Sequence, residues 1–232
     1  MKRFLAVVAC ALLLVSCGRQ GVRSFWSSHS IDYTHIRAAE DQFADFAELA
    51  VASRPEDACA AMDSLFDRLL EDEVAYYIYA EWVDGAFYTP LSPCRNAALY
   101  SKAVERMVTD GVFSQDDCEP FLQKRDWIQY NQKGAKATVP GRSSFKGRTL
   151  VLVLDLGCPS CREALEKLAS DPAWEDVEKW AVGLGYGPAP DVPGWEYLFP
   201  EDGTAVFDIH MTPVYFVVAA DGTVETSYTL AL

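Results

Sequence analysis

Two cysteines separated by two residues are the clearest chemical signal in the sequence. Cys158 and Cys161 lie in the stretch VLVLDLGCPSCREALEKL, residues 151–168. The apolar run before Gly157 predicts a buried strand over residues 149–155. After Pro159 the apolar residues recur at helical spacing, which predicts a helix over residues 159–170. The cysteines are therefore expected where a buried strand leads into the N-terminus of a helix.

A helix N-terminus favours a thiolate, because its backbone N–H groups lack partners and its dipole is positive there. If Cys158 is the N-cap, Pro159 becomes the first helical residue, where its missing N–H costs nothing. The N–H groups of Ser160 and Cys161 then point toward the Cys158 sulfur. We expect Cys158 to be the nucleophile and Cys161 to be a more shielded thiol that closes a disulfide with it. A dithiol in this position indicates redox chemistry.

The N-terminus reads as a lipoprotein signal peptide. Lys2 and Arg3 precede an apolar run over residues 4–15, which ends in LVSC at Cys17. The run is shorter than the roughly 18 residues that a membrane span needs. VVAC at Cys10 fits the same motif loosely but leaves too short an apolar stretch before it. We expect residues 1–16 to be removed and Cys17 to be lipidated, which anchors the chain in a bacterial cell envelope, facing the oxidising periplasm.

The charge balance excludes one class of partner. The chain carries 20 basic and 34 acidic residues, a net charge of −14. Such a surface disfavours nucleic acid, and its simplest role is to keep the protein soluble.

The remaining sequence divides into two halves. After a linker over residues 17–30, residues 31–133 show helical periodicity and predict an all-α domain of about five helices, three of them starting at Pro55, Ser92 and Ser114. The polar, Gly- and Ser-containing residues 134–148 predict a linker that leads into the next domain. Residues 149–232 alternate strand and helix, so we expect an α/β domain.

Within that α/β domain, the later elements can be placed from their patterns. Strands are expected over residues 179–186, 214–220 and 224–230, with a short helix over residues 204–209. Asp221-Gly222 predicts the turn of a hairpin between the last two strands. A parallel first part followed by an antiparallel hairpin is the thioredoxin-like arrangement.

The chain resembles a known family at two stretches of this domain. FKGRTLVLVL leads into CPSCREAL, and FDIHMTPVYFVVAADGTV contains Thr212-Pro213. They are similar to stretches of the membrane-anchored, TlpA-like thiol:disulfide oxidoreductases, which have a thioredoxin-like domain. The resemblance implies a cis Pro213 packed against the redox pair, with the Thr212 backbone positioned to pair with a substrate strand. It implies protein or small thiol and disulfide substrates and no cofactor.

The first half also has a resemblance, and the second half departs from its family in three places. FWSSHSIDY, FADFAEL and YTPLSPCRNAALY are similar to the uncharacterised helical domain of some envelope lipoproteins. In the second half, Gly157 replaces the usual tryptophan, and the proline follows the first cysteine. No carboxylate lies behind the pair at Leu152, and Asp155 is the nearest acid. The usual proton acceptor for the second thiol is therefore missing.

Two other functions are compatible with the same residues. The domain could be a redox-inert binding or scaffold module, or Cys158, Cys161 and His210 could hold copper(I). A structural zinc site would need a second cysteine pair, which the sequence lacks. Two further sets of residues have no assigned role. Three cysteines of the helical half could form one disulfide and leave one free thiol, or could all be buried free thiols. A cluster of aromatic residues could form a groove for a partner, although core packing is the simpler explanation. These sets are Cys59, Cys94 and Cys118, and Tyr76, Tyr77, Tyr79, Trp82, Phe87 and Tyr88.

Overall fold

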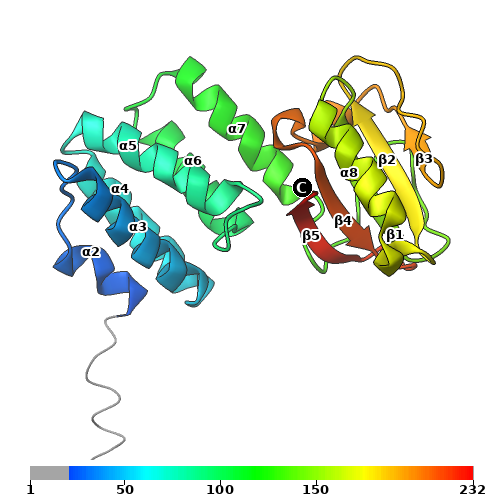
Figure 1. Cartoon of the computed structure of the whole chain (residues 1–232). Helices are drawn as coiled ribbons and strands as arrows, with labels where there is room; N and C mark the ends of the chain where they lie inside the picture. The colour runs from blue at the N-terminus through cyan, green and yellow to red at the C-terminus, as the bar shows by residue number, and fades with distance from the viewer. Residues whose placement is uncertain (1–20, 232) are drawn as a thin grey trace, which may run out of the picture. The chain divides into compact units, whose positions relative to one another are not determined.

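The computed structural model describes residues 21–231 (Figure 1). The expected signal peptide and the candidate lipidation site Cys17 lie outside these residues. The described chain forms two compact units, one ending at Trp82 and the other beginning at Val83. The sequence-based domain limits, 31–133 and 149–232, stay a prediction. None of the described helices is long and apolar enough to span a bilayer.

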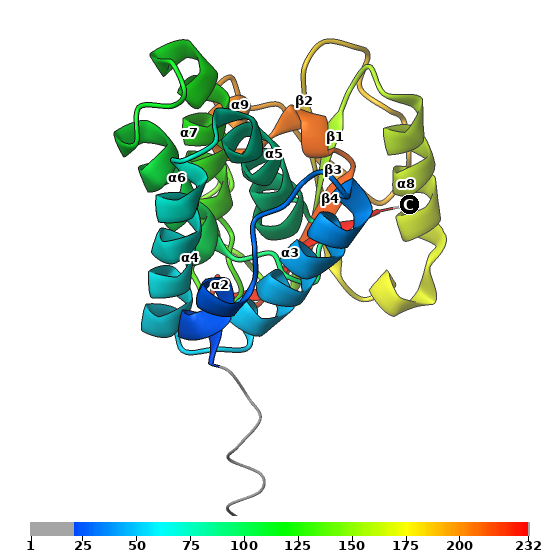
Figure 2. The same cartoon turned by 90° about the vertical axis from the view of Figure 1, so that its left-hand side faces the viewer.

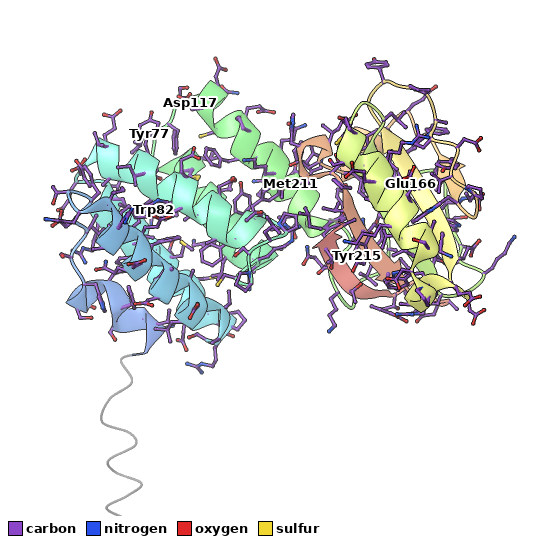
Figure 3. All side chains as sticks on the ribbon, viewed as in Figure 1. Tyr77, Trp82, Asp117, Glu166, Met211 and Tyr215 are labelled. Carbon is purple, nitrogen blue, oxygen red and sulfur yellow. The ribbon has the colours of Figure 1, made fainter. Side chains whose placement is uncertain are left out.

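The first unit is helical and is built around buried aromatic rings. Trp26 and Tyr79 are fully buried, and their ring centroids lie 6.0 Å apart. Phe46 is 5.0 Å from Trp26 and equally buried. Tyr77, labelled in Figure 3, is 39% exposed, whereas Tyr76 and Tyr79 of the same predicted cluster are fully buried. The elements are η1 (Val22–Ser24), α2 (Phe25–Ser28), α3 (Ile36–Val51), α4 (Pro55–Leu69) and α5 (Glu73–Val83).

The second unit begins with a π-helix, η2 (Asp84–Tyr88), followed by α6 (Ala97–Thr109) and α7 (Gln115–Gln129). The predicted start at Ser114 is confirmed, because Ser114 and Asp117 form a reciprocal capping box. The predicted helix start at Ser92-Pro93 is wrong. These residues form a turn, and the helix begins after Asn96, whose side chain accepts the backbone N–H groups of Ala98 and Leu99.

A five-stranded mixed sheet forms the rest of the second unit. Its strand order is β3-β2-β1-β4-β5. β2 pairs in parallel with β1 and with β3, whereas β4 pairs antiparallel with β1 and with β5. The predicted thioredoxin-like arrangement is confirmed. The elements are β1 (Thr149–Asp155), α8 (Pro159–Ser170), η3 (Pro172–Trp174), β2 (Glu178–Leu184), β3 (Glu196–Leu198), α9 (Gly203–Val206), η4 (Ile209–Met211), β4 (Val214–Val218) and β5 (Val224–Leu230).

Two apolar layers cover the central strand β1. Leu150, Leu152 and Leu154 face α8, which lies along one face of the sheet (Figures 1 and 2). Val151 and Val153 face the opposite layer, to which α9 and the segment before β1 contribute. Alternate residues of a strand point to opposite faces, so the uninterrupted apolar run in the sequence reflects burial on both sides.

Three elements of the α/β domain have the limits expected from the sequence, and the others are corrected. β1, α8 and β5 have the predicted limits. The strand predicted over residues 179–186 is β2 over Glu178–Leu184, and the strand predicted over residues 214–220 ends at Val218 as β4. The predicted helix over residues 204–209 is instead two short pieces, α9 and η4, since the Asp208 side chain caps a new turn. The edge strand β3 was not predicted, because three residues in a Pro- and Gly-containing connection carry too short a pattern.

Asn131 fastens the segment before β1 to the sheet. It is buried and adopts a left-handed backbone conformation, with φ at 53°. Its amide group donates to the Thr138 carbonyl at 3.2 Å and to the Tyr228 hydroxyl at 2.9 Å. Its side-chain oxygen accepts the Thr138 backbone N–H at 2.7 Å. One side chain therefore makes three hydrogen bonds that local backbone could not replace.

We expect Asn131→Ala to destabilise the protein by about 2 to 4 kcal/mol, because buried partners lose their hydrogen bonds and alanine tolerates this conformation poorly. Denaturant unfolding measures the change. Gln129→Ala is the control, since the Gln129 side chain is exposed and binds Ser101. A loss below about 0.5 kcal/mol for Asn131→Ala would contradict this role.

Candidate functional site

The end of β1 places Cys158 at the helix N-terminus. The Asp155 carbonyl accepts the Cys158 N–H at 3.1 Å, and the Asp155 carboxylate accepts the Gly157 N–H at 2.9 Å. These bonds close the turn between strand and helix. Cys158 is the N-cap of α8 with extended backbone, and Pro159 follows in the first turn, as predicted.

The Cys158 thiol is the more acidic of the pair. Its sulfur lies 3.0 Å from the Ser160 hydroxyl, and the thiol is partly exposed. That hydroxyl is the largest cause that lowers the pKa of Cys158, and burial opposes it only in part. The N–H groups of Cys161 and Ser160 lower the pKa further. Both helix donors expected from the sequence therefore contribute, but the Ser160 side chain outweighs them.

Cys161 has the opposite character. It is 2% exposed and packs in the layer between α8 and β1. Burial raises the pKa of Cys161 to about 11, against the Asp155 N–H and the Thr212 side chain, which act to lower it. Leu152 is fully buried in the same layer. The family that the chain resembles has a carboxylate at this position. A thiol in this setting stays protonated at neutral pH.

Thr212 and Pro213 lie next to this pair in the fold. The peptide bond between them is cis, as predicted. The Thr212 hydroxyl donates to the Ile209 carbonyl at 2.8 Å. Val214 pairs with Val153, which places Thr212 at the end of β1, and the Thr212 side chain acts to lower the pKa of Cys161. The structure thus brings Thr212 to the second cysteine. The role of Thr212 and Pro213 in positioning a substrate stays a prediction.

A cavity of about 350 Å³ opens beside the cysteines, and the sequence interpretation did not include it. Gly157, Pro159 and Arg162 line one side, and the loop 188–191 lines the other. Two glycines bring that loop close. A Cβ at Gly185 would lie 2.9 Å from the Asp155 carboxylate, and one at Gly187 would lie 2.7 Å from the Leu156 carbonyl. The sequence analysis took residues 183–186 as the end of a strand and the following GPAP as the start of a connection, so it did not indicate the cavity.

The remaining candidate residues do not join the pair. His210 is exposed on η4, and its backbone N–H donates to Asp208. Within residues 21–231, no group of three His, Cys, Asp or Glu side chains is placed to hold a metal ion. Cys94 and Cys118 are buried, and Cys59 is half-buried. Burial raises the pKa of Cys118, whose thiol contacts the Met107 carbonyl.

A solved structure shares this architecture. The chain is similar to a thioredoxin-like protein from Bacteroides caccae, with a TM-score of 0.67 and 17% sequence identity. The match covers 90% of this chain and 87% of the other. The fold is thioredoxin-like, preceded by helices. No family model matches the chain, and no curated protein does.

The Ser160 contact predicts how the first thiol titrates. We expect Ser160→Ala to raise the pKa of Cys158 and to slow its alkylation at neutral pH by about threefold to tenfold, since the thiolate loses a hydrogen bond. Peptide-resolved alkylation of the reduced protein across pH measures both. Ser170→Ala, at the other end of α8, is the control, because the Ser170 hydroxyl donates to Glu166. An unchanged Cys158 profile would show that Ser160 does not activate the thiol.

Proposed function

We propose that this protein is a thiol:disulfide oxidoreductase that acts through Cys158 and Cys161. The observation that carries the proposal is the contrast between the two thiols. Cys158 is partly exposed and has a lowered pKa, whereas Cys161 is buried behind it with a raised pKa. The thioredoxin-like fold supports this reading, because it places a dithiol at the start of a helix packed on the sheet.

The chemistry follows from these two environments. The Cys158 thiolate attacks a substrate disulfide, forms a mixed disulfide, and releases the first substrate sulfur as a thiolate. Cys161 then loses its proton to solvent or to that departing sulfur and attacks the Cys158 sulfur. The second substrate sulfur leaves, and the Cys158–Cys161 disulfide remains. Two electrons pass from the dithiol to the substrate, and the reverse sequence oxidises a substrate dithiol.

The second step requires Cys161 to lose its proton, and Leu152 provides no carboxylate to accept it. With a pKa of about 11, Cys161 is rarely a thiolate at neutral pH. In the mixed disulfide the Cys158 thiol no longer raises this pKa, but burial, the largest cause, remains, so Cys161 still has to lose a proton before it attacks. We infer that the mixed disulfide lives long enough to be captured even in the wild-type protein.

We further propose that the mature protein is a lipoprotein held in a bacterial envelope membrane through Cys17. The support is the sequence LVSC after an apolar run. An oxidising compartment on the periplasmic side fits a protein that exchanges disulfides. The dithiol makes thiol- or disulfide-bearing proteins and small molecules the expected partners. The acidic surface disfavours nucleic acid.

The test of the redox proposal is trapping. Cys161→Ser is expected to accumulate mixed disulfides between Cys158 and envelope proteins, because the resolving sulfur is absent. Cys158→Ser is expected to abolish both trapping and reduction of a model disulfide such as insulin. Non-reducing gels and mass spectrometry of the trapped species measure this. Cys118→Ser is the matched control, since it removes a buried thiol of α7, outside the Cys158–Cys161 pair.

Other outcomes would favour the alternatives. Stoichiometric copper binding by the reduced protein, lowered by either change and without disulfide exchange, would replace the redox proposal with a metal site. An absence of exchange, trapping and metal binding would leave a binding or scaffold module.

The lipoprotein proposal has its own test. Protein purified from native membranes is expected to begin at Cys17 and to carry acyl chains, as read by intact-mass analysis. Cys17→Ser is expected to release the chain from the membrane fraction. A mature chain that retains residues 4–15, or an unmodified Cys17, would contradict the proposal.

A further inference from the structure

A buried hydrogen bond links two parts of the second unit that are far apart in the sequence. The Tyr88 hydroxyl donates to one carboxylate oxygen of Asp208 at 2.7 Å. The other oxygen accepts the His210 backbone N–H at 2.9 Å and so caps η4. Asp208 is 8% exposed and Tyr88 is 3% exposed. Because a buried carboxylate is costly without hydrogen bonds, the Tyr88 hydroxyl is a required partner for Asp208.

The Tyr88 ring is held on several sides. The Arg95 guanidinium lies 5.6 Å from the ring centroid, and it also donates to the Tyr88 carbonyl. The Lys124 ammonium lies 5.5 Å from the same centroid, and the Tyr100 ring lies 5.2 Å away. Burial raises the pKa of Tyr88, so its hydroxyl keeps the proton that it donates. The hydroxyl therefore has one fixed direction, toward Asp208.

The helix η4 carries this constraint to the redox pair. It ends at Met211, labelled in Figure 3, and Thr212 follows. The Thr212 backbone N–H and hydroxyl both bond to the Ile209 carbonyl, at 3.3 and 2.8 Å. β4 pairs antiparallel with β1, with Val214 opposite Val153, so Thr212 lies where β1 ends and the cysteine turn begins. The Thr212 side chain also acts to lower the pKa of Cys161. A hydroxyl has one proton, so it can serve the Ile209 carbonyl while Cys161 is a thiol and turn to the sulfur when the thiolate forms.

We propose that Tyr88 and Asp208 are positioning residues for the second cysteine: their hydrogen bond fixes η4 and thereby holds the Thr212 hydroxyl beside Cys161. Tyr88, at the end of η2, and Asp208, before η4, thus support the attack by Cys161 without touching substrate. The significance for turnover rests on the proposed function. The placement of Thr212 beside Cys161 does not depend on the proposed function.

The groups that act on Cys161 define the measurement. They are the Asp155 backbone N–H, the Cys158 thiol and the Thr212 side chain. In a Cys158→Ser background the neighbouring thiol is absent, so the alkylation rate of Cys161 reports its thiolate fraction and its accessibility. Peptide-resolved alkylation from neutral to alkaline pH separates the two, since the thiolate fraction sets the midpoint and accessibility sets the plateau.

We expect Tyr88→Phe to slow Cys161 alkylation below the midpoint by about twofold to tenfold, the effect of losing one hydrogen bond to the thiolate. Thr212→Val is expected to do the same. The two changes together are expected to give no further loss, because Tyr88 acts through Thr212. Tyr100→Phe is the matched control: it removes a hydroxyl from a neighbouring buried ring, but that hydroxyl donates to Asp84 at 2.8 Å and not to η4. Tyr100→Phe is expected to leave the profile unchanged.

A purely structural role for Tyr88 predicts the opposite sign. Loosened packing would expose Cys161 and raise its plateau rate. A raised rate, an unchanged rate, or losses that add between Tyr88→Phe and Thr212→Val would each overturn the proposal. If Tyr88→Phe does not fold, as judged by thermal unfolding, Asp208→Asn is measured instead and the same criteria apply. The readout needs no disulfide exchange, so failure of the proposed function and failure of this inference are seen separately.

Discussion

Burial of β1 on both faces is the constraint on which the second unit depends. Five consecutive apolar residues, 150–154, are buried only if the strand lies inside the sheet and is covered on both faces. α8 covers one face and the layer with α9 covers the other. The chain therefore leaves the carboxyl end of β1 at the turn where Cys158 begins α8. It returns through η4 and starts β4 at the same end of β1. Thr212 lies near the cysteines because the start of β4 and the start of α8 are both at the carboxyl end of β1.

The two thiols of the site differ in acidity and in exposure: Cys158 is accessible with a lowered pKa, and Cys161 is buried with a raised pKa. Hydroxyl and N–H donors favour the charged form of Cys158, and desolvation disfavours that of Cys161. The same helix produces both effects, since its first residue faces solvent and its next turn enters the core. Two sulfurs so close together differ because one turn of helix crosses the boundary between water and the apolar layer.

Local patterns predicted what local forces decide. The limits of β1 and α8 followed from an apolar run and from Pro159, because strand burial and helix initiation leave marks within a few residues. α6 was misplaced, because Ser92-Pro93 resembles a helix start and Asn96 makes the actual cap. The bond between Tyr88 and Asp208 joins residues 120 positions apart, and no periodicity announces such a contact. The Ser160 contribution to Cys158 likewise depends on a side-chain rotamer, which spacing does not reveal.

The loop that borders the cavity has a consequence for recognising chains of this architecture. Gly185 and Gly187 are required by close approach to Asp155 and Leu156, and Gly185 also has a left-handed backbone. That steric demand is independent of the sulfur chemistry. A descendant that lost both thiols would still need the two glycines to keep its loop, whereas one that lost the glycines would have to rebuild the cavity wall. The glycine pair therefore depends on the shape of the loop, and the cysteine pair on the sulfur chemistry proposed for the site.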